Sequence, residues 1–140
     1  MGLFDSFRIS GSGLTAERLR MDTIANNLAN ANTTRTEQGG PYRRQMVVFS
    51  AINGDSKPYK KRIGGGVKVV GITQDPALPK LVYDPQHPDA NEDGYVAFPN
   101  VNVVTEMVDL ITATRAYEAN ITAINAAKSM ALKALDIGRV

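Results

Sequence analysis

The chain has 140 residues, with 16 basic and 14 acidic side chains and a formal net charge of +2. That length predicts one domain, or one domain with an insertion. The balanced charge does not favour a nucleic-acid partner, and the absence of cysteine excludes disulfides, thiol catalysis and a cysteine zinc site. Apolar runs are too short for a transmembrane helix, and we expect no secretory signal peptide.

Helical spacing begins at Leu14. Leu14, Met21 and Leu28 recur every seven residues, and Ile24 falls on the same side, which predicts an amphipathic helix. Phe7 extends this series backwards, but glycines 11 and 13 are expected to loosen or interrupt the helix there. Asparagines and threonines at 30–34 favour caps and turns, so the helix should end near residue 30.

The middle of the chain, residues 36–98, is broken by glycine and proline clusters. Runs rich in β-branched and aromatic residues predict short strands at 42–49, 67–73, 81–83 and 94–98. We expect them to form a small antiparallel unit with long loops.

A second, longer helix is predicted from about residue 102 to 137. Asn102 is a good N-cap candidate, and two seven-spaced series of mostly apolar residues follow it. Alanines such as Ala113 and Ala127 would let a neighbouring helix approach closely. The simplest arrangement pairs the two terminal helices as a coiled coil or bundle.

The predicted fold class is therefore α+β, mainly α. Residues 1–34 and 100–140 should form one discontinuous helical domain, and residues 35–99 a β-rich insertion between its halves.

Three motifs suggest ligand chemistry only weakly. Residues 11–16 fit the G-x-G-x-x-A nucleotide fingerprint, but no strand–helix–strand unit surrounds them. Asp89, Asn91 and Asp93 reproduce the opening of an EF-hand loop, which makes a calcium-dependent binding module the main alternative function. The twelfth position is Asn100 rather than glutamate, so an Asx-rich turn is the simpler interpretation. His87 is the only histidine, and we interpret it as a turn residue. We expect no enzyme activity, cofactor or small-molecule substrate. The sequence leaves the role of Lys60-Lys61-Arg62 open.

Several segments resemble one known family. SGLTAERLRMDTIANNLAN at residues 12–30 resembles the signature of bacterial flagellar axial proteins, the rod, hook and hook-associated proteins. GGVKV at 65–69, YDPQHPDAN at 83–91 and GYVAFPNVN at 94–102 are similar to the proximal-rod members of that family, as are EMVDLI at 106–111 and RAYEAN at 115–120.

The resemblance implies a structural subunit of the flagellar basal-body rod, in the periplasm, that is exported by the flagellar type III system without a cleaved signal and transmits motor torque to the hook. Expected partners are other rod subunits and the adaptor at the export gate, with the P ring and peptidoglycan nearby. We expect the terminal helices to order on assembly, with side-chain amides of Asn26 and Asn27 bridging helices. The predicted assembly interface comprises Leu14, Met21, Ile24, Asn26, Asn27, Leu28, Met107, Leu110, Tyr117, Ile121, Ile124 and Leu135.

Overall fold

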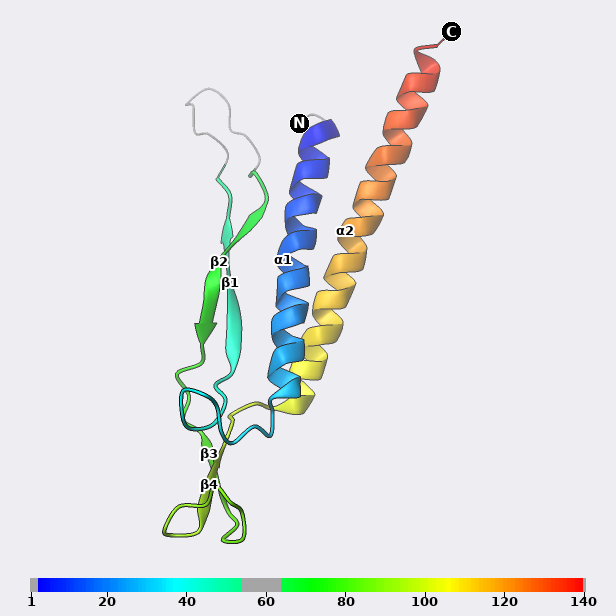
Figure 1. The fold of residues 1–140 in the computed structure, drawn as a ribbon. Coiled ribbons are helices and arrows are strands. Elements are labelled where there is room, and N and C mark those ends of the chain that lie inside the picture. The colour runs from blue at the N-terminus through cyan, green and yellow to red at the C-terminus, as the bar shows by residue number, and fades with distance from the viewer. Residues whose placement is uncertain (1–2, 54–63, 140) are drawn as a thin grey trace.

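The computed structural model describes residues 3–53 and 64–139. Helix α1 (Leu3–Ala29) and helix α2 (Val103–Ile137) lie side by side and antiparallel, so the two ends of the chain lie at the same end of the molecule (Figure 1). Between them come β1 (Gln45–Ala51), β2 (Val67–Gln74), β3 (Lys80–Tyr83) and β4 (Tyr95–Phe98). The predicted class, two paired terminal helices with a small antiparallel β insertion, is confirmed.

Helix α1 runs without interruption through residues 11–13, so the predicted loosening there is wrong. Contacts with neighbouring elements offset the low helix propensity of glycine. A Cβ on Gly13 would lie 3.0 Å from the Asn120 amide of α2, so the missing side chain lets the helices approach. The Ser12 hydroxyl donates to the carbonyl of Ile9 and accepts from the amide of Val67 in β2, tying this turn to the strands.

The core between the helices is small and rich in alanine. The buried residues are Ala16 and Ile24 of α1 and Ala113 and Ala127 of α2. The burial of the two α2 alanines agrees with the prediction that they let a neighbouring helix approach closely. Larger apolar side chains, including Met21 and those at 110, 117 and 124, flank this line half-buried. The pair therefore has a shallow interface rather than a deep core.

Both predicted helix boundaries near the strands are confirmed. The Asn102 side chain accepts from the amides of Val104 and Thr105, at 3.0 and 3.2 Å, and caps α2 as expected. At the end of α1, the Asn30 side chain bonds back to Asn26 and accepts from the Thr33 hydroxyl. These bonds satisfy groups that would otherwise be left open at a helix end.

The strands form two separate hairpins rather than one β unit. Strands β1 and β2 pair from Gln45↔Gln74 to Ala51↔Val67, with a register shift between Val48 and Phe49, and β3 pairs with β4. The first strand begins at Gln45 rather than 42, because the Tyr42 amide bonds to the Thr33 carbonyl and closes a loop. The β1–β2 hairpin contacts α1. Strands β3 and β4 lie beyond the end of the helix pair where α1 ends and α2 begins (Figure 1).

No helix among the described residues is both long and apolar enough to span a membrane. The basic run Lys60-Lys61-Arg62 lies outside the described residues.

Candidate assembly site

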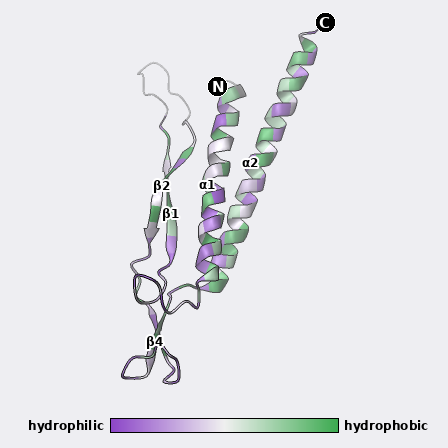
Figure 2. Cartoon of the chain, in the orientation of Figure 1, coloured by the Kyte–Doolittle hydropathy of each residue, from purple (hydrophilic) through white to green (hydrophobic). Residues whose placement is uncertain are grey.

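The helices leave much apolar surface uncovered. On the first three turns of α2, exposed fractions are 70% for Val104, 54% for Met107, 56% for Val108 and 56% for Ile111. At the opposite end of the same helix, Leu135 is 67% exposed. Hydrophobic residues continue along α2 past the described start of α1 (Figure 2). Contiguous exposed apolar surface is a feature of protein–protein interaction sites.

The structure divides the twelve predicted interface residues into three groups. Buried against other parts of the chain are Ile24 and Asn27. Half-buried at the edges of the helix pair are Leu14, Met21, Leu28, Leu110, Tyr117 and Ile124, and exposed are Asn26, Met107, Ile121 and Leu135. The first two groups are covered within the chain. Of the third group, Asn26 bonds to Tyr42, and Met107, Ile121 and Leu135 are 37–67% exposed.

A buried polar cluster joins the C-terminal end of α1, the start of β1 and the N-terminal end of α2. Asn27, 1% exposed, donates to the Gln45 carbonyl at 2.8 Å and accepts from the Gln45 amide at 2.9 Å. Its side chain thus pairs with β1 as a neighbouring strand would. It also donates to Glu106 Oε2 at 3.0 Å and accepts from the Tyr42 hydroxyl at 2.8 Å. Asn27 therefore bridges the two helices, as predicted.

Within the chain, Asn26 does not bridge the helices, and its bridging of helices between subunits stays a prediction. Its side chain donates to the Tyr42 hydroxyl at 3.2 Å and accepts from Asn30. The reason is its position one residue before Asn27, which turns it about 100° around α1 and toward solvent.

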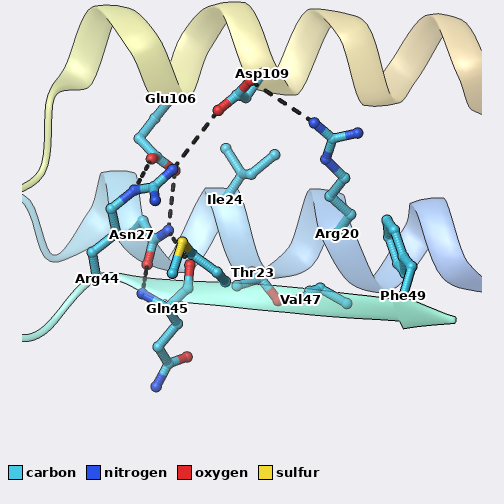
Figure 3. Close-up of a pocket in the computed structure, with 11 residues that line it drawn as sticks. Arg20, Thr23, Ile24, Asn27, Arg44, Gln45, Val47, Phe49, Glu106 and Asp109 are labelled. Atoms are coloured by element: carbon cyan, nitrogen blue, oxygen red, sulfur yellow. Dashed lines mark hydrogen bonds and ion pairs between the residues drawn. The ribbon is translucent and has the colours of Figure 1, made fainter. Parts of the chain in front are cut away.

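Arg44 neutralises the buried carboxylate of the cluster. Its Nε donates to Glu106 Oε1 at 2.6 Å, and its terminal nitrogens lie 3.6 Å from Asp75 and 3.8 Å from Asp109. Glu106 is 1% exposed, and a buried carboxylate is tolerated only when it is paired and hydrogen-bonded. Arg20 reaches Asp109 at 3.8 Å from α1, which extends the ion pairs across the helix pair (Figure 3).

The cluster shifts the pKa of two of its members. Burial raises the pKa of the Tyr42 hydroxyl, and the negative charge of Glu106 raises it further. For Arg44, burial works against the charged form, but the hydrogen bond to Glu106 and the neighbouring carboxylates outweigh it and raise the pKa. Tyr42 therefore stays neutral and Arg44 charged at neutral pH.

Between β1 and α2 lies a groove of about 370 Å³, with α1 as its floor (Figure 3). Ile24, Val47 and Phe49 supply apolar surface, and Arg20 and Asp109 supply charge. The cluster carboxylates are engaged by arginines or by Asn27. Among the described residues, no group of three or more histidine, cysteine or acidic side chains has a metal-binding arrangement. The hydrogen bonds and ion pairs of the cluster hold α1, β1 and α2 together.

Sequence reasoning missed Tyr42, Arg44 and Glu106. The residues they bond to are distant in sequence, since Arg44 and Glu106 are 62 residues apart. A short stretch of sequence therefore does not show that they pair. One signal was available: Glu106 stands seven residues before Ala113, on the side of α2 that faces α1. A carboxylate on a buried helix side predicts a buried partner of opposite charge.

The EF-hand interpretation of residues 89–94 is wrong, because strands β3 and β4 flank this loop instead of helices. Asp89 pairs with Arg35 at 2.6 Å and accepts from the Thr34 hydroxyl at 2.8 Å. Asn91 accepts from the amides of Asp93 and Tyr95. The Asx-rich turn is confirmed.

His87 is a turn residue, as predicted. Its Nδ1 accepts from the Asp89 amide at 3.0 Å, and its ring lies edge-on to Phe98.

Comparisons with known protein families match both terminal segments. Residues 7–35, which contain most of α1, match the family described as "Flagella basal body rod protein". Residues 92–137, which contain β4 and α2, match "Flagellar basal body rod FlgEFG protein C-terminal". Paired terminal helices around a β-strand insertion, with these two matches, define a protein of the flagellar basal-body rod class.

Curated relatives narrow the class to one family. "Flagellar basal-body rod protein FlgC" of Borreliella burgdorferi is 51% identical, covering 98% of this chain and 98% of the relative. The proteins of the same name from Bacillus subtilis and Salmonella typhimurium are 49% and 45% identical, each covering 99% of this chain and 100% of the relative. The chain therefore belongs to the FlgC family of flagellar basal-body rod proteins. The family resemblance seen in the sequence is confirmed, and the relatives carry the names of rod proteins rather than enzymes.

Proposed function

We propose that this protein is a structural subunit of the flagellar basal-body rod. It is exported by the flagellar type III system, polymerises through its terminal helices and transmits motor torque to the hook. Residues 1–34 and 100–140 act as the assembling helical domain, and residues 35–99 as an insertion that contacts further neighbours. Its partners are other rod subunits and the adaptor at the export gate, in the periplasm near the P ring and peptidoglycan.

The observation that carries this proposal is the unsatisfied apolar surface of α2. The buried apolar side chains of the described residues are three alanines, one isoleucine and one valine. Many larger apolar side chains on α2 are exposed. Fully burying a valine, leucine, isoleucine or methionine side chain contributes about 1.5–3 kcal/mol. Assembly with neighbouring helices therefore offers more apolar burial than the isolated helix pair provides.

Export favours a chain whose helices are marginal before assembly. Helices in proteins depend on tertiary packing for most of their stability, and, in the described chain, the buried apolar side chains between α1 and α2 are only Ile24 and three alanines. The helix ends distant from the Asn27 cluster should consequently open easily in the monomer and become ordered in the rod.

Substitution of Met107 tests the interface. Its side chain is 54% exposed, so Met107→Asp should leave the monomer fold intact and prevent incorporation into basal bodies. The matched control is Thr105→Asp, two residues earlier and also exposed. We would measure the amount of chain in basal bodies purified from cells that lack the native copy, together with swimming. Normal incorporation and swimming of Met107→Asp would contradict assembly through this helix.

A further inference from the structure

Strands β3 and β4 form a hairpin that stands apart from the other helices and strands of the described chain. Helix α1 contacts both strands of the β1–β2 hairpin, but within the described residues neither β3 nor β4 lies close to a helix, to β1 or to β2. In Figure 1 the β3–β4 hairpin accordingly extends beyond the end of the helix pair. Its position relative to the helices must therefore be set by the loops that join it to the rest of the chain.

Two covalent connections join this hairpin to the chain. Residues 75–79 lead from β2 into Lys80, and residues 99–102 lead from Phe98 into α2. Lys80 and Phe98 are register partners at the base of the hairpin. Three of the connecting residues are prolines, whose φ is fixed, whereas the others keep two soft backbone dihedrals each. Two adjacent connections define an axis, and rotation about that axis is free unless a third contact blocks it.

The third contact is made by one side chain, that of Asp89. Every hydrogen bond or ion pair that joins residues 80–98 to described residues outside that range ends on its carboxylate. One oxygen accepts from the Thr34 hydroxyl at 2.8 Å, and the other lies 2.6 Å from the Arg35 guanidinium. A cleft of about 320 Å³ is lined by residues from both segments, so the two segments are not closely packed there.

Both ends of this contact are fixed to the parts that they join. On the hairpin side, the Asp89 amide donates to His87 Nδ1 at 3.0 Å, and the His87 ring lies edge-on to Phe98 at the base. On the helix side, the Thr33 carbonyl accepts from the Tyr42 amide at 3.0 Å, and the Tyr42 hydroxyl bonds within the buried polar cluster. The Asp89 carboxylate therefore connects the hairpin to the cluster that joins the two helices.

We propose that the Asp89 carboxylate sets the angle between the β3–β4 hairpin and the helix pair, and that the hairpin swings on residues 75–79 and 99–102 when this contact opens. The Asp89 side chain is 19% exposed and that of Arg35 is 76% exposed, so the solvent-screened ion pair contributes less than the hydrogen bond from Thr34. A contact this small opens more readily than the hairpin unfolds. This inference does not rest on the proposed rod function.

Distances between two spin labels test this proposal in the purified full chain, which contains no native cysteine. Glu92→Cys places one label on the hairpin loop and Arg115→Cys places the other on α2, both at exposed positions. We expect one narrow distance distribution in the otherwise unsubstituted chain and a distribution about twofold wider with Asp89→Ala. The matched control is Asp93→Ala, in the same loop and exposed, whose side chain bonds to no described residue; it should leave the width unchanged.

Thr34→Val repeats the test from the other side of the contact, because it removes the donor without changing the hairpin. It should widen the distribution as Asp89→Ala does, and Arg35→Ala should widen it less. The rings of Tyr83 and Tyr95, 5.3 Å apart, should keep their NMR contacts in each variant. Unchanged widths in Asp89→Ala and Thr34→Val, or an equally wide distribution in the unsubstituted chain, would overturn the proposal. Loss of the ring contacts in both variants would also overturn it, because the bonds would then hold the hairpin together rather than orient it.

Discussion

Replacement of Asn27 by alanine should release β1 from the helix pair. The substitution removes four hydrogen bonds, two to the Gln45 backbone, one from Tyr42 and one to the Glu106 carboxylate. Net values are about 0.5–1.5 kcal/mol for a neutral hydrogen bond and about 1.5–3 kcal/mol for one to a charged group. Their simple sum is about 3–7.5 kcal/mol.

The expected loss lies near the lower end of that range, because Arg44 still pairs with Glu106 and water can enter the adjoining groove to satisfy the freed groups. We take about 3 kcal/mol as the loss for local opening, which corresponds to roughly a hundredfold increase in the opening equilibrium.

Hydrogen exchange of the Gln45 amide in the purified monomer measures this effect. Asn27→Ala should speed its exchange about a hundredfold, since the amide loses its partner and the strand loses its attachment. Asn26→Ala is the matched control: Asn26 is the preceding residue, is exposed and makes no side-chain bond to β1 or α2, so the Gln45 amide should change less than about threefold. Equal effects of the two substitutions would refute the view that the cluster attaches the hairpin.

Two further results are expected. Gly11→Ala should raise the free energy of unfolding by up to about 1 kcal/mol, because a Cβ there meets nothing within 4 Å. Gly13→Ala should raise it less or lower it, because its Cβ would press on Asn120. Equal thermal shifts of the two variants would contradict close helix contact at Gly13. Because the folded-state pKa of Tyr42 is raised from 10.0, its favourable contribution is complete below pH 10 and is lost as the pH rises through the higher folded value. In an absorbance titration, Tyr42→Phe should remove a late-ionising tyrosine; an unchanged titration would argue against burial of this hydroxyl beside Glu106.

Local patterns in the sequence predicted the elements well. Asn102 caps α2 as its position before an apolar series indicated, and strands occur in each of the four β-branched runs. Such features depend on neighbours within a few residues, which a single sequence displays. The close approach of Asn120 to Gly13, which leaves little room for a side chain there, could not be predicted because the tertiary fold sets it.

The candidate site was predicted less completely for the same reason. Asn27 was identified from its place inside an amphipathic helix, but its partners Arg44 and Glu106 are brought to it by the tertiary fold. Periodicity alone also could not separate side chains that pack within the chain, such as Ile24, from those left exposed, such as Met107. That separation needs the register of the helix pair.

The central claim, that the terminal helices complete their packing only in the assembled rod, is tested most directly by hydrogen exchange of the full chain as dilute monomer and within purified rods. We expect a gradient in the monomer, with the slowest helix exchange near Asn27 and Glu106 and fast exchange toward Leu3 and Ile137. In the rod, α1 and α2 should become uniformly protected. Equally strong protection of both helices in the monomer and in the rod would show a self-contained domain and contradict folding coupled to assembly.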